Sequence, residues 1–442
     1  MAEEYQFTLY LHYYKIKKNE LFKKDSIYKN LSILISGTVL AQVVPIALQP
    51  ILKRVFTPED FGVFDIYLKI LGILFVVFAL KYDMGVILPK NKIKAQIILL
   101  ISVLSALFFT IITFLVIVLF KDSIINYLDI NPRYSSTLYL LPFSTLFYSL
   151  YNSINYFLIR EKKFLASSLS KVSRRGVEGA VQIGMGVGFG SALKSSGLFV
   201  GDLLGNIAYF ITAYFQSFKG ISIDKRFFNF RLMKHIAKEY IDLPKYNLLP
   251  ELLNSFFTAS LTFIVLSKFS IEDVGYLEAT QRLLAVPAAF VSVSLGQVVL
   301  QRVSENVSKK AKIIPDLKLL VLMMTAIAVA FTVFIAFLGP ISFKIFLGDA
   351  FEKSGVYAQY LILFFSVSFL FSPLGQVLIA LKEFRANAIW QVSKFFIIYA
   401  LFFIPFESIS SFLIAYGNIG AGVYLLYGVI IFVKAYKYDS KL

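Results

Sequence analysis

The stretch "FTPEDFG" at residues 56–62 returns almost unchanged as "FSIEDVG" at residues 269–275. Each copy stands in a short break between two long apolar runs. In each copy a hydroxyl residue, Thr57 or Ser270, can cap the helix that follows, and the two acidic residues after it suit a helix N-terminus. The motif therefore forms a good turn by itself. Its repetition in the second part of the chain indicates two structurally related halves.

The composition is typical of a protein that lies largely within a membrane. Of 442 residues, 58 % are hydrophobic and only 16 % are charged, and the mean hydropathy is +0.73. Soluble domains carry about 25 % charged residues. Apolar runs long enough to cross a ~30 Å hydrocarbon layer as helices recur along the chain. We therefore predict an all-α polytopic membrane protein with about twelve spans, at 31–52, 62–80, 95–120, 134–159, 173–191, 197–218, 247–267, 275–300, 314–338, 356–381, 388–406 and 410–433.

The positive residues collect on one side of these predicted spans. Most of the 44 Lys and Arg residues fall in the two terminal segments and in every second loop. Cytoplasmic loops of membrane proteins carry such an excess, so we expect both termini to be cytoplasmic. The net charge of +17 follows from this bias and from contact with anionic lipids. It does not require nucleic acid as a partner.

The spans divide six and six around a basic loop. We predict a cytoplasmic leader, a first six-helix bundle, a basic cytoplasmic linker, a second six-helix bundle and a cytoplasmic tail, at 1–30, 31–218, 219–246, 247–433 and 434–442. Six crossings return the chain to the same side, so the bundles are parallel repeats related by a pseudo-two-fold axis along the membrane normal. This arrangement is typical of transporters whose substrate site lies between the repeats.

Charged residues inside the second span of each half align with one another. Asp65 corresponds to Glu278, and Lys69 corresponds to Arg282. A base near the middle of a span costs roughly 2.5–3.5 kcal/mol on insertion scales, so it needs a partner or water. One interpretation is two local ion pairs whose bases reach toward the exterior surface. The other is two cations that face each other across a water-filled cavity.

A second charged group lies nearer the cytoplasm. Arg174 and Glu178 are four residues apart in the fifth span of the first half, and Lys394 occupies the corresponding place in the second half. Asp202, at the start of the sixth span, is expected to cap that helix, with a coupling cation as the alternative. Cations in a hydrated cavity favour an anionic substrate, because Arg and Lys bind phosphate oxygens well. A lipid-linked pyrophosphate is one such anion.

Polar side chains in other spans are further candidates. Gln42 and Gln49 are seven residues apart, hence on one face of the first span, and Asn152 lies in the fourth. These residues either contact the substrate or join packed helices by hydrogen bonds.

Several classes of function are disfavoured. The chain has no Cys and only two His, both outside the apolar runs, so we expect no metal site and no cofactor. It has no nucleotide-binding P-loop. The exterior loops are short and lack His, which disfavours a glycan polymerase or ligase. We therefore expect a transporter, not an enzyme.

The segments "SGTVLAQVVPIALQPILKRVFTPEDFGVFDIYLKI" (36–70) and "KYDMGVILPK" (81–90) resemble the Wzx-like O-antigen and polysaccharide flippases of the multidrug/oligosaccharidyl-lipid/polysaccharide exporter superfamily. The resemblance implies a MATE-like fold in the bacterial inner membrane. It implies alternating access that moves undecaprenyl-pyrophosphate-linked oligosaccharide from the cytoplasmic to the outer leaflet, for O-antigen, capsule or another surface polysaccharide. It also implies that cationic residues, here Lys69, Arg282, Arg174 and Lys394, meet the pyrophosphate. Membrane lipids, the polysaccharide polymerase and chain-length machinery, and a coupling cation are the expected partners. A MATE-type cation-coupled exporter of small molecules is the alternative.

Overall fold

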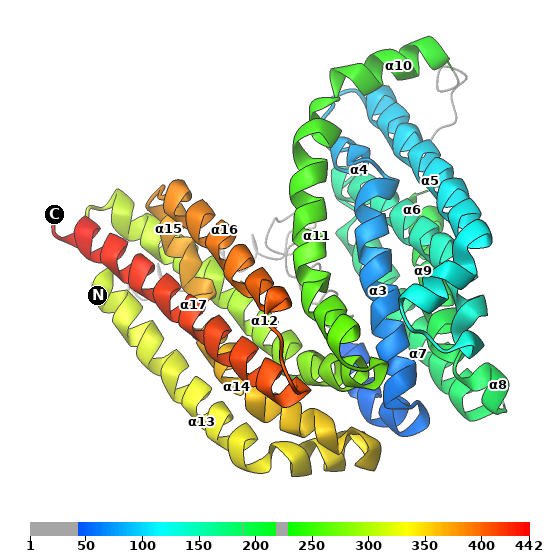
Figure 1. The fold of residues 1–442 in the computed structure, drawn as a ribbon. Coiled ribbons are helices and arrows are strands. Elements are labelled where there is room, and N and C mark those ends of the chain that lie inside the picture. Colours follow the sequence, from blue (N-terminus) through cyan, green and yellow to red (C-terminus); the bar gives the residue numbers. More distant parts are fainter. Residues whose placement is uncertain (1–42, 189, 218–228) are drawn as a thin grey trace, which may run out of the picture. The chain divides into compact units, whose positions relative to one another are not determined.

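The computed structural model describes residues 43–188, 190–217 and 229–442, and all of the regular structure in these ranges is helical (Figure 1). Residues 43–55 form the first helical segment described. The later elements follow in chain order: α3 (Pro58–Phe78), α4 (Tyr82–Gly85), α5 (Lys92–Tyr127), η1 (Pro132–Tyr139), α6 (Leu140–Arg160), α7 (Phe164–Gly188), α8 (Ser191–Lys194), α9 (Gly197–Ser217), α10 (Phe230–Glu239), α11 (Asp242–Lys268), α12 (Ile271–Ser308), α13 (Ile314–Leu347), η4 (Asp349–Phe351), α14 (Glu352–Phe371), η5 (Pro373–Gly375), α15 (Gln376–Ala380), α16 (Phe384–Ala400), η6 (Leu401–Phe403) and α17 (Ile409–Asp439).

Eight helical stretches of the described chain are long and apolar enough to cross a membrane. These stretches are Pro58–Phe78, Lys92–Tyr127, Gly197–Ser217, Asp242–Lys268, Ile314–Leu347, Asp349–Ala380, Phe384–Phe403 and Ile409–Asp439. Three other predicted spans coincide with helices α6, α7 and α12, which carry more polar residues. The first predicted span lies largely outside the described residues. The all-helical polytopic architecture is confirmed, and the count of twelve spans stays a prediction.

The helices form two compact units. The first comprises Met1–Val55 and Tyr67–Thr258, and the second comprises Phe56–Ile66 and Ala259–Leu442. Helices α3 and α11 therefore each begin in one unit and end in the other. The predicted leader and the beginning of the predicted linker lie outside the described residues. The predicted division into bundles at 31–218 and 247–433 stays a prediction.

Within the first unit, helix α10 packs against α5 at the end where α5 begins (Figure 1). Ile236 on its inner face is buried in a cluster with Phe157. Lys94 at the start of α5 pairs with Glu239 at the end of α10, with a nitrogen–oxygen distance of 2.9 Å. Part of the predicted linker is thus a docked amphipathic helix.

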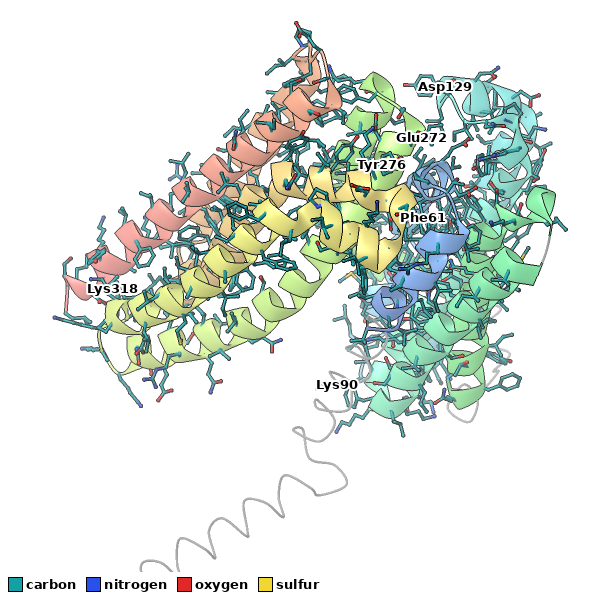
Figure 2. The ribbon with its side chains drawn as sticks, turned by 90° about the horizontal axis from the view of Figure 1, so that it is seen from below. Phe61, Lys90, Asp129, Glu272, Tyr276 and Lys318 are labelled. Atoms are coloured by element: carbon teal, nitrogen blue, oxygen red, sulfur yellow. The ribbon has the colours of Figure 1, made fainter. Side chains whose placement is uncertain are left out.

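The two copies of the repeated motif contact each other in the second unit. A Cβ atom at Gly62 would lie 2.1 Å from the carbonyl oxygen of Ile271, and a Cβ atom at Gly275 would lie 1.8 Å from that of Pro58. The seventh residue of each copy thus packs on the third residue of the other. This reciprocal contact fits a two-fold relation between the halves. Figure 2 labels Phe61, which precedes Gly62, and Tyr276, which follows Gly275.

The predicted helix caps are confirmed in both copies of the motif. Asp60 accepts hydrogen bonds from the backbone N–H and the hydroxyl of Thr57, and its own N–H donates to the Thr57 hydroxyl. Ser270 and Asp273 form the equivalent capping box at the start of α12. In the second copy the cap is extended, because Asp273 also accepts from Lys353 at 2.8 Å and from the Tyr357 hydroxyl at 2.5 Å. The motif is therefore structural in both halves.

The last helix of the second unit caps the start of α13. Both carboxylate oxygens of Asp439 accept backbone N–H groups, one from Ile313 at 2.9 Å and one from Ile314 at 3.0 Å. We expect Asp439→Ala to lower the free energy of unfolding by about 1 kcal/mol, the usual effect of removing a cap. Thermal unfolding in detergent micelles measures this change. The matched control is Asp349→Ala, whose side chain is 89 % exposed and should have no measurable effect. Equal melting temperatures for the two variants would contradict the prediction.

Candidate substrate site

A buried ion pair joins α7 to α9 in the first unit. The Arg174 guanidinium lies 3.4 Å from one carboxylate oxygen of Asp202, which has no exposed side-chain surface. Ser144 Oγ donates to the other oxygen at 2.5 Å, and Asn206 Nδ2 donates to it at 3.1 Å. A buried charge requires such partners, since unpaired it is very costly. The expectation that Asp202 caps a helix is wrong, because α9 begins at Gly197 and Asp202 lies within it.

Two tyrosine rings cover the Arg174 guanidinium. Its central carbon lies 4.9 Å from the ring centroid of Tyr148 and 5.5 Å from that of Tyr209, which stacks on Tyr151. Desolvated cation–π contacts contribute about 2 kcal/mol. The guanidinium is thus held in place, and its buried Nε–H has no hydrogen-bond partner among the described residues.

Two glycines of α9 allow α7 to come this close. A Cβ atom at Gly205 would lie 2.9 Å from Cβ of Glu178, and one at Gly201 would lie 3.0 Å from the carbonyl oxygen of Glu178. Small residues four positions apart are typical of close helix contacts in membranes. Asp202 lies between these glycines along α9 and so faces the α7 segment that carries Arg174. Glu178 itself accepts a hydrogen bond from Arg175 at 2.7 Å.

A second ion pair lies within α12, in the second unit. Arg282 Nε donates to a carboxylate oxygen of Glu278, one helical turn earlier. The spacing of the two residues predicts this pair, and the structure contains it. The Glu278 side chain is 5 % exposed, whereas that of Arg282 is 25 % exposed. The pair therefore has a buried acid and a more accessible base.

The corresponding acid of α3 has a partner on another helix. Asp65 is buried and accepts a hydrogen bond from Thr262 Oγ1 of α11 at 2.7 Å, within the second unit. Lys69, one turn later, is partly exposed. Lys69 belongs to the first unit and Arg282 to the second. The arrangement in which the two bases face one another stays a prediction.

Lys394 lies among aromatic rings in the second unit. Its ammonium nitrogen is 4.9 Å from the ring centroid of Trp390 and 5.7 Å from that of Tyr424. The residue is partly buried in α16. Aromatic faces attract a cation without neutralising it. Like Arg174, Lys394 lies close to two aromatic rings, and its contact with substrate stays a prediction.

The polar candidates are held by local or tertiary hydrogen bonds. Gln49 is buried, and its Nε2 donates to the Pro45 carbonyl at 3.0 Å. Asn152 donates to Asp83, a buried carboxylate just after α3. Gln42 lies outside the described residues. These contacts suit helix packing, and a role of Gln49 and Asn152 in substrate binding stays a prediction.

Within the described ranges, no group of three or more His, Cys, Asp or Glu side chains could hold a metal ion. In the first unit, the residues gathered around Arg174 are tyrosines, a serine, an asparagine and the carboxylate of Asp202.

Comparison with known proteins places the chain in a family. The model for a family described as polysaccharide biosynthesis protein matches residues 51–356. The chain belongs to this family. Among curated proteins no match is found.

Solved structures with a similar fold are transporters. An inward-facing multidrug resistance MATE family transporter of the MOP superfamily has a TM-score of 0.65 at 12 % identity, over 92 % of this chain and 99 % of that one. The lipid II flippase MurJ, in an inward closed conformation, has a TM-score of 0.64 at 15 % identity, over 92 % of this chain and 90 % of that one. At such identities the likeness shows the fold alone. This member of the polysaccharide biosynthesis protein family has a MATE-like fold, as expected.

The structure adds site residues to this family member that the sequence analysis missed. They surround Arg174 and come from two helices, α6 and α9: Ser144, Tyr148, Tyr151, Asn206 and Tyr209. One local signal was present, since Asp202 and Asn206 are four residues apart on α9 and so share a face. Tyr209 also lies on α9, whereas Ser144, Tyr148 and Tyr151 come from α6, whose packing on α9 no local spacing reveals.

Proposed function

We propose that the protein is a flippase that moves undecaprenyl-pyrophosphate-linked oligosaccharide repeat units from the cytoplasmic to the outer leaflet by alternating access. Family membership supports a role in polysaccharide biosynthesis, and the MATE-like fold supports transport. Movement between leaflets breaks no covalent bond, so the proposal makes the protein a transporter and not an enzyme, and no cofactor is needed.

The distribution of charge within the ion pairs is the observation that carries this proposal. In the pairs Arg174–Asp202, Arg282–Glu278 and Arg175–Glu178, the carboxylate is in each case less exposed than the guanidinium. The acids lie deep between helices and orient the bases, whose side chains are the more exposed members of these pairs. Arginine presents several donors in a plane and binds phosphate oxygens in pairs. Such an arrangement suits a pyrophosphate and disfavours a cationic drug.

The proposal includes the organisation expected from the sequence. The protein lies in the bacterial inner membrane with both termini in the cytoplasm, and the two repeats enclose the substrate path. The polysaccharide polymerase and chain-length machinery use its product. A coupling cation supplies the driving force where product removal does not.

Loss of the duplicated bases tests the proposal. In a strain that lacks its flippase and makes the matching glycan, we expect wild-type protein to restore surface polysaccharide. We expect Lys69→Ala and Arg282→Ala to reduce it severalfold, and the double variant to abolish it, because each cation offsets pyrophosphate charge in a poorly hydrated path. Surface glycan per unit of membrane-inserted protein is the measurement.

The matched control for these variants is Lys309→Ala, which removes a base whose side chain is 66 % exposed and should leave transport unchanged. Full activity of the double variant at normal protein levels would refute a role of these two bases in transport. Failure of wild-type protein to restore glycan, together with drug resistance in the same strain, would instead favour a MATE-type exporter of small molecules.

A further inference from the structure

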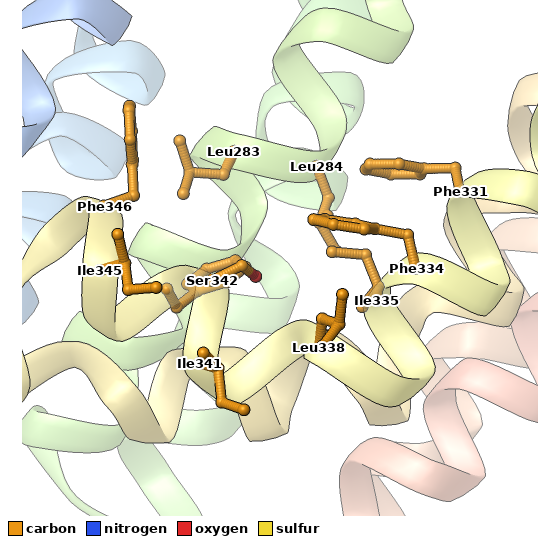
Figure 3. A pocket seen from close by; sticks show the side chains of 11 residues that line it. Leu283, Leu284, Phe331, Phe334, Ile335, Leu338, Ile341, Ser342, Ile345 and Phe346 are labelled. Carbon is orange, nitrogen blue, oxygen red and sulfur yellow. The ribbon is translucent and has the colours of Figure 1, made fainter.

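An apolar hollow of about 490 Å³ lies between α12 and α13 in the second unit (Figure 3). Leu283 and Leu284 of α12 form one wall, and α13 residues such as Phe334 and Ile341 form the other. Among the described residues that line the hollow, Ser342 alone has a polar side chain, and its hydroxyl donates to the Gly339 carbonyl at 2.9 Å. The hollow therefore offers almost no hydrogen-bonding groups and suits a hydrocarbon.

Helix α13 has a break in its backbone hydrogen bonding where it lines the hollow. Pro340 has no N–H, so the carbonyl of Ala336 lacks its usual helical partner. The side chain of Gln359 on α14 donates to that carbonyl at 2.7 Å. A Cβ atom at Gly355 would lie 2.5 Å from the Gly339 carbonyl oxygen, so α14 packs directly on this point. The lining residues come from both sides of Pro340, and the neighbouring helix holds this geometry in place.

The α13 side of the hollow is exposed over much of its surface. Phe334, Ile341 and Ile345 are exposed apolar residues of a helix apolar enough to span the bilayer. In a membrane such a surface meets lipid chains. An occupant can thus enter sideways from the bilayer without crossing a polar barrier.

A cation on α12, Arg282, adjoins the lining residue Leu283 in sequence and is paired with Glu278. Arg282 lies seven residues beyond Gly275. At 1.5 Å per residue it is about 10 Å along the helix from that point. The phosphate of a resident phospholipid stays in the headgroup region outside the hydrocarbon layer. A lipid whose phosphate moves through the protein can reach this arginine.

We propose that the α12–α13 hollow binds the polyisoprenoid tail of the lipid-linked substrate while Arg282 contacts its pyrophosphate. This inference rests on the proposed flippase function and gives it a tail-binding subsite. The subsite lies toward the C-terminal end of α13, which the charge pattern places at the exterior side. It therefore holds the tail when the pyrophosphate has reached the outer half of the membrane.

Cysteine labelling tests the inference, because the natural chain has no Cys. Ser342→Cys places a single thiol in the hollow, and Ile327→Cys places one at an exposed position of α13 outside it. Both proteins are reconstituted in phosphatidylcholine vesicles and alkylated with a membrane-permeant maleimide. Undecaprenyl diphosphate should slow alkylation of Ser342→Cys about fivefold when present at about four times its dissociation constant. Alkylation of Ile327→Cys should not change.

Dioleoylphosphatidic acid is the control lipid for undecaprenyl diphosphate, since it carries a phosphate but has ordinary acyl chains in place of the polyisoprenoid tail. Equal protection by both lipids would overturn the proposal in favour of a general acyl-chain groove, and protection by neither would overturn it outright. Surface glycan in the complemented strain separates this failure from failure of the proposed function. If wild-type protein restores surface glycan but undecaprenyl diphosphate does not slow alkylation of Ser342→Cys, only the tail subsite is rejected. If wild-type protein does not restore surface glycan, both the tail subsite and the flippase function are rejected.

Filling the hollow with a larger side chain tests the inference independently, with surface glycan as the measurement. Ser342→Phe should reduce surface glycan severalfold at an unchanged melting temperature, while Ile327→Phe should leave it unchanged. Normal transport by Ser342→Phe would contradict the proposal.

Discussion

Gly62→Ala and Gly275→Ala are each expected to destabilise the second unit and abolish transport. The added Cβ would lie 2.1 Å and 1.8 Å, respectively, from a backbone carbonyl oxygen of the other motif copy. Backbone cannot move aside as a flexible side chain does, so the helices must separate. Overpacking of this kind costs about 1–3 kcal/mol. Combining the two substitutions should give no rescue, because both enlarge the same contact.

Gly72→Ala is the matched control on the same helix, α3. A Cβ atom there would meet nothing within 4 Å. Alanine favours a helix over glycine by roughly 0.5–1 kcal/mol, so this variant should be as stable as wild type or slightly more stable. Thermal unfolding and surface glycan are measured on all variants. If Gly62→Ala and Gly275→Ala behave like Gly72→Ala, the close crossing of the motifs is not required.

The sequence shows that the motif is repeated, but it does not show that the two copies pack against each other. Caps at Thr57 and Ser270 follow from local rules, because a hydroxyl residue and an acid three positions later satisfy each other's backbone groups. The contact of Gly62 with Ile271 joins residues far apart in the chain. Sequence repetition indicates that two segments have similar structures, but it does not predict a contact between them.

Apolar periodicity predicted the helices better than it predicted their ends. The expected span at 197–218 corresponds closely to α9, Gly197–Ser217. By contrast, α13 continues to Leu347, past the expected end at residue 338. A proline normally ends a helix, and here Gln359 of α14 satisfies the carbonyl that Pro340 leaves without a partner. Tertiary contacts of this kind override local breaking signals and are invisible in the sequence.

The charged candidates were predictable where acid and base share a helix, as in Glu278 and Arg282, and not where they lie on different helices. Charged residues inside apolar runs are conspicuous, so Arg174, Arg282 and Lys394 could be identified directly. The partner of Arg174 was not, because Asp202 lies on another helix and resembles a cap by its position near a helix start. In the structure the acids Asp65, Asp202 and Glu278 are all buried.

Arg174→Gln is expected to be among the most destabilising single changes in the first unit. It leaves the Asp202 carboxylate, which has no exposed side-chain surface, without its counter-charge. Removing one member of a buried ion pair costs about 3–5 kcal/mol. Arg174→Lys keeps the charge but loses the planar group that lies over Tyr148 and Tyr209, so it should be intermediate. Arg302→Gln is the control, because its pair with Asp316 is exposed and should contribute less than about 1 kcal/mol.

The double variant Arg174→Gln with Asp202→Asn separates folding from transport. It removes both charges together, so it should be more stable than Arg174→Gln alone, with a coupling energy of about 0.5–3 kcal/mol. Amide groups can still accept the hydrogen bond of Ser144 and donate to nearby carbonyls. We nevertheless expect this folded protein to leave surface glycan at the level of the flippase-deficient strain, because it lacks the cation that we propose binds the pyrophosphate. Normal transport by the double variant would show that Arg174 serves the packing of α7 on α9 and that the pyrophosphate binds elsewhere.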